Sequence, residues 1–255
     1  SIDYLAVGLP FKKIAFTFGV MPFSSVGYRV ANTSNVNNLE RFRQFEGSGG
    51  VDRVFLASGY QLNNNFRIGL EANFNFGTVE TVNREFVADL ETGTRETNTS
   101  RLNGSSFTVG LMYERPLNEK LTSFASFAYT PETVMRSTNR RNLANLLNSP
   151  VLGNLVVDEI DLPVENTRIT LPSKLNFGLG IGGKNKWLLG AEITHQQSSS
   201  FGNRFNDIDR VDFENATRIV LGGYFVPKYN SFTSYFSRVV YRAGLRFENT
   251  GLVMQ

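Results

Sequence analysis

The chain has 255 residues, and its hydrophobic content of 41% excludes a disordered protein and allows one large domain or two small ones. Its mean hydropathy is −0.20, and it has no apolar run of the length that a transmembrane helix requires. The absence of Cys excludes disulfides and thiolate metal sites, and the net charge of +3 is scattered, so we expect no nucleic-acid partner.

Apolar and polar residues alternate along most of the chain, which predicts strands. The alternation predicts about eleven strands, in chain order at residues 3–9, 13–22, 27–45, 51–61, 66–82, 104–115, 120–130, 168–181, 186–197, 213–226 and 238–248. One segment, "NRRNLANLLNSPVL" (Asn139–Leu152), has leucines at helical spacing and is predicted to be a helix inside a loop. This helix could guard an entrance or pack as a lid, and both alternatives stay open.

Short and long connections alternate between these strands. Turn residues form the short connections at 10–13, 62–65, 116–120 and 182–186, and polar residues form the long ones at 31–50, 79–104, 130–167 and 197–212. In a meander of antiparallel strands this puts all short turns at one end of the sheet. Short periplasmic turns and long extracellular loops are typical of outer-membrane barrels.

The stretch "FRIGLEANFNFG" (66–77) places Phe, Ile, Leu and Ala on one strand face and Arg, Gly, Glu and Asn on the other. A soluble sandwich would also alternate, with the apolar face inward. The membrane alternative is favoured because the polar face carries Gly, Asn, Arg and Glu but little Lys, and because the strand lengths suit a bilayer. Aromatic residues near strand ends also suggest interfacial girdles: Tyr4, Phe11, Phe66, Tyr113, Tyr129, Trp187, Tyr241 and Phe247.

The sequence therefore predicts an all-β fold, an antiparallel up-and-down transmembrane β-barrel, as a single domain over residues 1–255 in the bacterial outer membrane, with the lipid bilayer as its first partner. An odd number of strands is unusual in bacterial single-chain barrels, and the last residue, Gln255, is not aromatic. We therefore expect the chain to be incomplete, with strands missing at the C-terminal side.

Several stretches carry a family resemblance: "MPFSSVGYRV" (21–30), "GSGGVDRVFLASGYQLNNNFRIGLEANFNFGTVE" (47–80), "LPSKLNFGLGIGGKNKWLLGAEIT" (171–194) and "LGGYFVPKYNSFTSYFSRVVYRAGLRFENTGLVMQ" (221–255). They resemble the Bacteroidota outer-membrane proteins related to the long-chain fatty acid transporter barrels. The resemblance implies a monomeric barrel of 14 strands, with an N-terminal hatch in its lumen, that passes hydrophobic small molecules such as fatty acids or aromatic hydrocarbons. Nothing in this chain matches the hatch, which we expect to be missing from it.

Polar residues on the inner phase of the strands are the candidate site. We predict that eight of them line the lumen: Arg67, Glu71, Asn73, Lys174, Asn176, Glu192, Arg242 and Arg246. They could line a permeation path or hold a hatch, or they could be paired charges that fill the bore.

Other motifs offer little chemistry. His195 is the one His, and we expect an interfacial surface residue rather than a catalyst or metal ligand. Gly178, Gly180 and Gly183 match GxGxxG, but a turn and a strand follow instead of the helix that a dinucleotide site needs. We therefore expect no catalytic residues, no metal and no cofactor.

The function that we predict is passive passage of hydrophobic small molecules. The alternative is a non-catalytic accessory barrel in a larger outer-membrane protein secretion or assembly complex, with other subunits as partners. An outer-membrane enzyme would need a Ser/His/Asp or paired-carboxylate cluster that the sequence does not offer.

Overall fold

The structure is a computed structural model that describes residues 3–36, 39–149, 153–200 and 211–254. Within these ranges nearly all regular structure is antiparallel β, and one short 3-10 turn, η1 (Ser198–Ser200), is the exception. No described helix has the length and apolar character to cross a membrane.

A sheet of 13 strands contains almost the whole fold. Its main path runs β1-β2-β3-β4-β5-β6-β10-β11-β13-β14, and β7, β8 and β9 branch from β5. The strands are β1 (Leu5–Pro10), β2 (Ile14–Val36), β3 (Leu39–Gln61), β4 (Phe66–Val87), β5 (Thr92–Pro116), β6 (Thr122–Thr130), β7 (Thr133–Ser149), β8 (Gly153–Leu162), β9 (Thr167–Leu171), β10 (Lys174–Gly183), β11 (Trp187–Gln196), β13 (Ala216–Phe225) and β14 (Tyr241–Asn249). Two further strands, β12 (Val211–Phe213) and β15 (Leu252–Met254), pair with each other.

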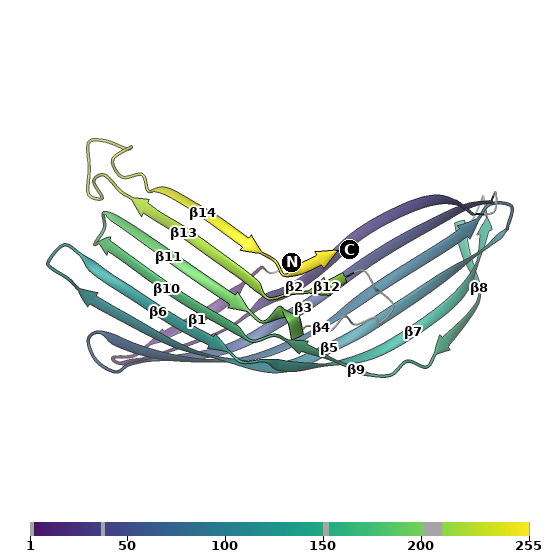
Figure 1. The fold of residues 1–255 in the computed structure, drawn as a ribbon, viewed down its shortest axis with the longest axis horizontal. Coiled ribbons are helices and arrows are strands. Elements are labelled where there is room, and N and C mark those ends of the chain that lie inside the picture. Colours follow the sequence, from purple (N-terminus) through teal and green to yellow (C-terminus); the bar gives the residue numbers. More distant parts are fainter. Residues whose placement is uncertain (1–2, 37–38, 150–152, 201–210, 255) are drawn as a thin grey trace.

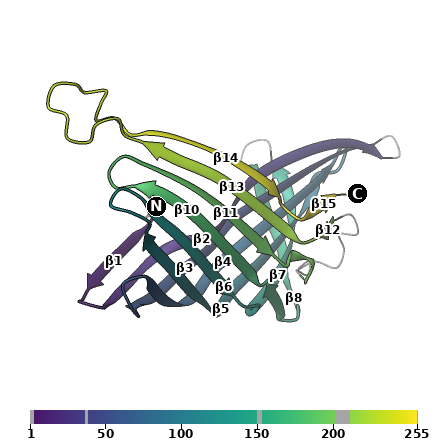
Figure 2. The same cartoon turned by 60° about the vertical axis from the view of Figure 1, so that its left-hand side comes forward.

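The sheet curls into a trough that resembles part of a barrel wall (Figure 1). In the described part of the chain, β1 pairs with β2 alone and β14 with β13 alone, so both edge strands have one neighbour. Figure 2 shows the strands tilted together, as in barrels. The fold class predicted from the sequence is confirmed, although the sheet has 13 strands where about eleven were expected.

The faces of the sheet are arranged as a membrane barrel requires. Phe74, Leu179 and Leu245 are 49%, 53% and 62% exposed, whereas Asn73 and Asn75 on the opposite face are 5% and 0% exposed. A soluble sandwich would bury the apolar set and expose the amides. The apolar side chains therefore point outward, toward hydrocarbon, and the polar ones point into the trough.

Short turns gather at one end of the sheet, as predicted. They join β1 to β2, β3 to β4, β5 to β6 and β10 to β11 at the left of Figure 1. The connection 226–240 between β13 and β14 lies at the same end, yet it is much longer than its neighbours (Figure 1).

The long connections predicted at 31–50, 79–104 and 130–167 are wrong, because most of their residues belong to strands. The pairing of β2 with β3 continues out to Val36↔Leu39, so the predicted strand 27–45 spans two antiparallel strands and the connection between them. The pairing of β4 with β5 likewise continues to Phe86↔Gly93. These outer arms carry polar residues on both faces, and a strand outside the hydrocarbon loses the alternation that identifies it in sequence.

The helix predicted at Asn139–Leu152 is also wrong where the structure describes it, since Asn139–Ser149 lie in β7 and residues 150–152 are outside the described ranges. β7 pairs with β5 on one side and with β8 and β9 on the other. The register of β7 with β5 is continuous, so Leu143 and Leu147 lie on one face of the strand and Leu146 on the other; the register shift with β8 skips Val157 of β8 and leaves β7 regular. Pairing distant in sequence therefore overrides the local pattern here.

Two prolines interrupt neighbouring strands at the same level. Pro131 separates β6 from β7, and Pro172 separates β9 from β10, so the predicted strand 168–181 is two strands. Ladder pairs stop at Thr130↔Lys174 and resume at Thr133↔Leu171. Because proline has no N–H to donate, the ladder is weakened at this level of the wall.

Candidate functional site

A cavity of about 350 Å³ lies on the inner side of the sheet, level with the two prolines. Its walls include Phe23 from β2 and Gln196 from β11, which are far apart in strand order. Side chains of such distant strands can meet only on the concave face of a curled sheet. The other lining residues are Arg53, Glu71, Asn73, Ser106, Thr108, Ala128, Thr130, Pro131, Thr133, Leu171, Pro172, Lys174 and Asn176.

One wall of the cavity is organised around Arg53. Its Nε donates to Asn75 Oδ1 at 2.8 Å, and its guanidinium lies 4.1 Å from the ring centroid of Phe23, a cation–π contact. Asn73 Nδ2 donates to Glu71 Oε1 at 2.9 Å, while the buried Asn73 Oδ1 has no partner within the described residues. One acceptor of this wall is therefore buried without a donor among the described residues.

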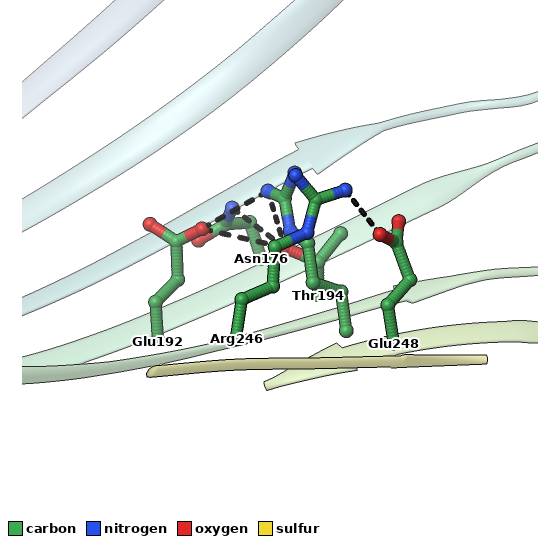
Figure 3. A network of polar contacts seen from close by, with 6 residues as sticks. Asn176, Glu192, Thr194, Arg246 and Glu248 are labelled. Atoms are coloured by element: carbon green, nitrogen blue, oxygen red, sulfur yellow. Dashed lines mark hydrogen bonds and ion pairs between the residues drawn. The ribbon is translucent and has the colours of Figure 1, made fainter. Parts of the chain in front are cut away.

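The facing wall carries a chain of polar contacts across β10, β11 and β13 (Figure 3). Asn176 Nδ2 donates to Thr194 Oγ1 at 3.2 Å, and Arg218 Nη2 lies 3.2 Å from both Thr194 Oγ1 and Glu192 Oε1. On β14, Arg246 donates to Glu248, and both side chains rise from the same sheet face as Glu192 in Figure 3. Each carboxylate in this wall thus has an arginine partner.

The structure brings together half of the residues predicted to line the lumen. Glu71, Asn73, Lys174 and Asn176 all line the cavity. Arg67 lies nearer the short turns, where its Nη1 donates to Glu114 Oε2 at 2.6 Å. Glu192 and Arg246 belong to the facing wall, and Arg242 follows Tyr241 near the start of the edge strand β14. Their role as lumen lining in the membrane stays a prediction.

Sequence reasoning missed Phe23 and Arg53. Phe23 lies just past the predicted strand 13–22, at the register shift between Pro22 and Ser24 in the pairing of β2 with β3, so no strand phase was assigned to it from the sequence. Arg53 could have been found from the sequence, because alternation places it on the same inner face of β3 as Phe55. Phe55 is 8% exposed. An arginine among apolar strand residues is the signal.

A small apolar cluster closes the cavity toward the outer arms. Val51, Leu102 and Met135 are buried together, and Val79, Ile169 and Leu171 pack against them. Leu171 belongs to both the cluster and the cavity wall. The interior is therefore polar at the cavity and apolar directly beyond it, and not one continuous apolar track.

Arginine–carboxylate pairs connect the outer arms. Glu46 accepts from Arg84 Nη1 at 2.7 Å and pairs with Arg29 Nε at 2.9 Å, and the hydrogen bond from Arg84 lowers the pKa of the Glu46 carboxyl. On the β7–β8 hairpin, the hydrogen bond from Arg140 and a second from Asn142 lower the pKa of Asp161. These pairs lie beyond the hydrocarbon and hold adjacent polar strands in register.

Catalytic and metal chemistry find no support in the part of the chain that the structure describes. No group of three or more His, Asp or Glu side chains there could hold a metal ion. His195 Nδ1 lies 3.1 Å from Thr217 Oγ1 on the neighbouring strand, an ordinary cross-strand contact. The GxGxxG glycines lie in β10 and lead through a turn into β11, without the helix that binds a pyrophosphate.

Comparisons with known proteins agree with this architecture. Among solved structures, the chain is similar to the CymD monoaromatic hydrocarbon channel, with a TM-score of 0.52 and 13% sequence identity over 96% of this chain and 68% of the channel. At this identity the likeness concerns the fold alone. None of the proteins with curated functions is similar enough in sequence to match. The family model of BamG matches residues 1–255, so this outer-membrane β-barrel chain belongs to the BamG family.

Proposed function

We propose that the chain is a non-catalytic accessory barrel of the outer-membrane barrel-assembly (Bam) complex. The observation that carries the proposal is the match of the BamG family model over residues 1–255. A family defined on the entire sequence is better evidence of a shared role than a likeness of fold, because one fold serves many functions.

The inner face supports an accessory role in two ways. Several of its charges are paired, as in Arg67 with Glu114 and Arg218 with Glu192, so these charges connect strands and are not free to bind a permeating ion. The apolar cluster of Val51, Leu102 and Met135 occupies the interior beyond the cavity. A wall stiffened in this way suits a protein that presents surfaces to other subunits.

Co-purification tests the proposal. The full-length protein, tagged in its native outer membrane, is isolated in mild detergent, and the accompanying proteins are quantified against those recovered with an unrelated tagged barrel. We expect the central assembly barrel to be strongly enriched, and depletion of the chain to lower the abundance of other outer-membrane barrels. Equal recovery with both tagged proteins would refute the assignment.

A second candidate is passage of hydrophobic small molecules, which is the role that the long-chain fatty acid transporter resemblance implies. Two observations favour it, namely the fold shared with a hydrocarbon channel and a cavity beside a wall that two prolines interrupt. A fluorescent fatty acid or an aromatic hydrocarbon, titrated against the solubilised full-length protein, tests this candidate. Saturable binding that Leu171→Arg abolishes would support it, and a linear, unsaturable signal would eliminate it.

A further inference from the structure

We propose that the short-turn end of the barrel carries a docking surface for an acidic protein partner in the periplasm. The surface consists of the connection 226–240, here called the aromatic loop, and the adjacent turns 117–121 and 183–187, here called the lysine turns. This inference rests on the proposed function, since it states where the accessory barrel would contact its complex.

Lysine is concentrated at this end of the molecule. Lys12, Lys13, Lys120, Lys184, Lys186 and Lys228 all lie in connections there, and Lys174 is the remaining lysine of the sequence. Within the described connections at this end, Glu119 is the only carboxylate. The short-turn end is therefore strongly basic, whereas the outer arms balance Arg with Glu and Asp. Such a surface attracts an acidic partner and steers its approach.

The aromatic loop presents large side chains to solvent. Tyr229, Phe232, Tyr235 and Phe236 are 66%, 97%, 71% and 73% exposed. The backbone that carries them is held by internal hydrogen bonds, including Lys228 N to Ser237 O at 2.8 Å. Tyr235 and Phe236 also form an edge-to-face pair with ring centroids 5.8 Å apart. The loop backbone thus holds the rings in a preorganised arrangement, which lowers the conformational entropy lost on docking.

Lipid does not account for these rings. Cross-strand pairing aligns Trp187, Phe225 and Tyr241 at the last level of the strands, where barrels place their interfacial girdle. The aromatic loop continues past that level, and it projects beyond the other turns in Figure 2. Aromatic surface in the aqueous compartment is typical of protein interfaces, where Tyr, Phe and Arg are enriched.

The lysine turns continue this surface. A hollow of about 710 Å³ between them is lined by Lys120, Lys184, Lys186 and Trp187, among others. Val226 N, at the base of the aromatic loop, donates to Lys186 O at 2.6 Å, so the loop and the turns are joined. Lys228 and Arg238 add positive charge within the loop itself. The matching partner therefore has an apolar pocket for Phe232 with carboxylates around it.

A photoreactive amino acid at position 232 of the full-length protein, irradiated in native membranes, tests the contact. Position 64, in the short turn 62–65 at the same end, is the matched control. We expect position 232 to cross-link to an identified periplasmic subunit or domain of the assembly complex, and position 64 to do so far less. Cross-links from position 232 to phospholipid alone, or to a second copy of this chain, would overturn the proposal.

Substitution separates this inference from the proposed function. The triple variant Phe232→Ser/Tyr235→Ser/Phe236→Ser and the charge reversal Lys228→Glu/Arg238→Glu should each lower recovery of the complex about tenfold or more, as loss of interface anchors does. The control Leu62→Ser changes an exposed apolar residue in a short turn outside the docking surface and should leave recovery intact. Full recovery with both loop variants refutes the docking surface but not the function, whereas failure of the wild type to recover the complex refutes the function itself.

Discussion

Replacement of Leu70 by Arg tests directly which medium the apolar face contacts. Leu70 lies on the outward face of β4 and is 52% exposed in the isolated chain. It follows Phe66, the first residue of β4 and a predicted girdle aromatic, by four positions. At about 3.4 Å per residue and a tilt of about 40°, Leu70 lies about 10 Å inside a hydrocarbon band about 25 Å thick.

The two media predict different free energies of unfolding for this variant. In water, replacing an exposed Leu by Arg changes the free energy of unfolding by no more than about 0.5 kcal/mol. Near the bilayer midplane, the same change costs about 2–4 kcal/mol, or roughly 30- to 900-fold in the folding equilibrium. We expect the larger loss, because the arginine must either lose its hydration or distort the bilayer around it.

Leu62 supplies the matched control, since it is 51% exposed and lies in a short turn. Leu62→Arg should change the free energy of unfolding by no more than about 1 kcal/mol, the cost at the interface. Guanidinium titration of the full-length protein in vesicles gives both values, with the fluorescence of Trp187 as reporter. Equal stability of Leu70→Arg and wild type would refute the membrane-facing assignment.

Three further changes test the wall and the arms. Gly77→Ala should cost about 1–3 kcal/mol in guanidinium titrations, because its Cβ would lie 2.1 Å from a backbone oxygen, whereas Gly69→Ala has 3.6 Å and should be nearly neutral; equal effects would contradict the packing. Arg53→Ala removes the donor to a buried amide oxygen and should cost about 1–3 kcal/mol, so an unchanged midpoint would show that the oxygen is otherwise satisfied. Arg140→Gln should raise the pKa of Asp161 in an NMR titration; since folding lowers that pKa, the stabilisation is present above the unfolded value of 3.8 and is lost as pH falls through the folded pKa. An Asp161 titration that does not change would show that the pair does not form in solution.

The membrane-spanning part of the fold could be predicted from sequence because one face of each strand must contact hydrocarbon. Alternation at Phe66–Phe76 and in the last strand identifies β4 and β14 and their faces directly. Outside the hydrocarbon that requirement disappears, and both faces of the arms become polar. Strand pairing there depends on residues distant in sequence, such as Arg84 with Glu46, so local patterns predict loops for the arms and a helix for the second half of β7.

Which residues point to the inner face could be predicted wherever the alternation of a strand was clear. Glu71, Asn73, Lys174 and Asn176 meet at one cavity because their phase and level on the strands agree. Their specific contacts were not predictable, since they depend on a register shift at Pro22 and on two prolines in neighbouring strands. Single-sequence reasoning has no access to such long-range register.

Lipid accessibility along β4 is the most direct test of the arrangement on which this account depends. The 255-residue sequence has no Cys, so positions 69, 70, 71 and 74 can each be replaced by a single cysteine that carries a spin label. We predict that oxygen, which partitions into hydrocarbon, relaxes the labels at 70 and 74 most strongly, and that a water-soluble nickel chelate does not. Equal accessibility at all four positions, or stronger oxygen effects at 69 and 71, would contradict an outward apolar face.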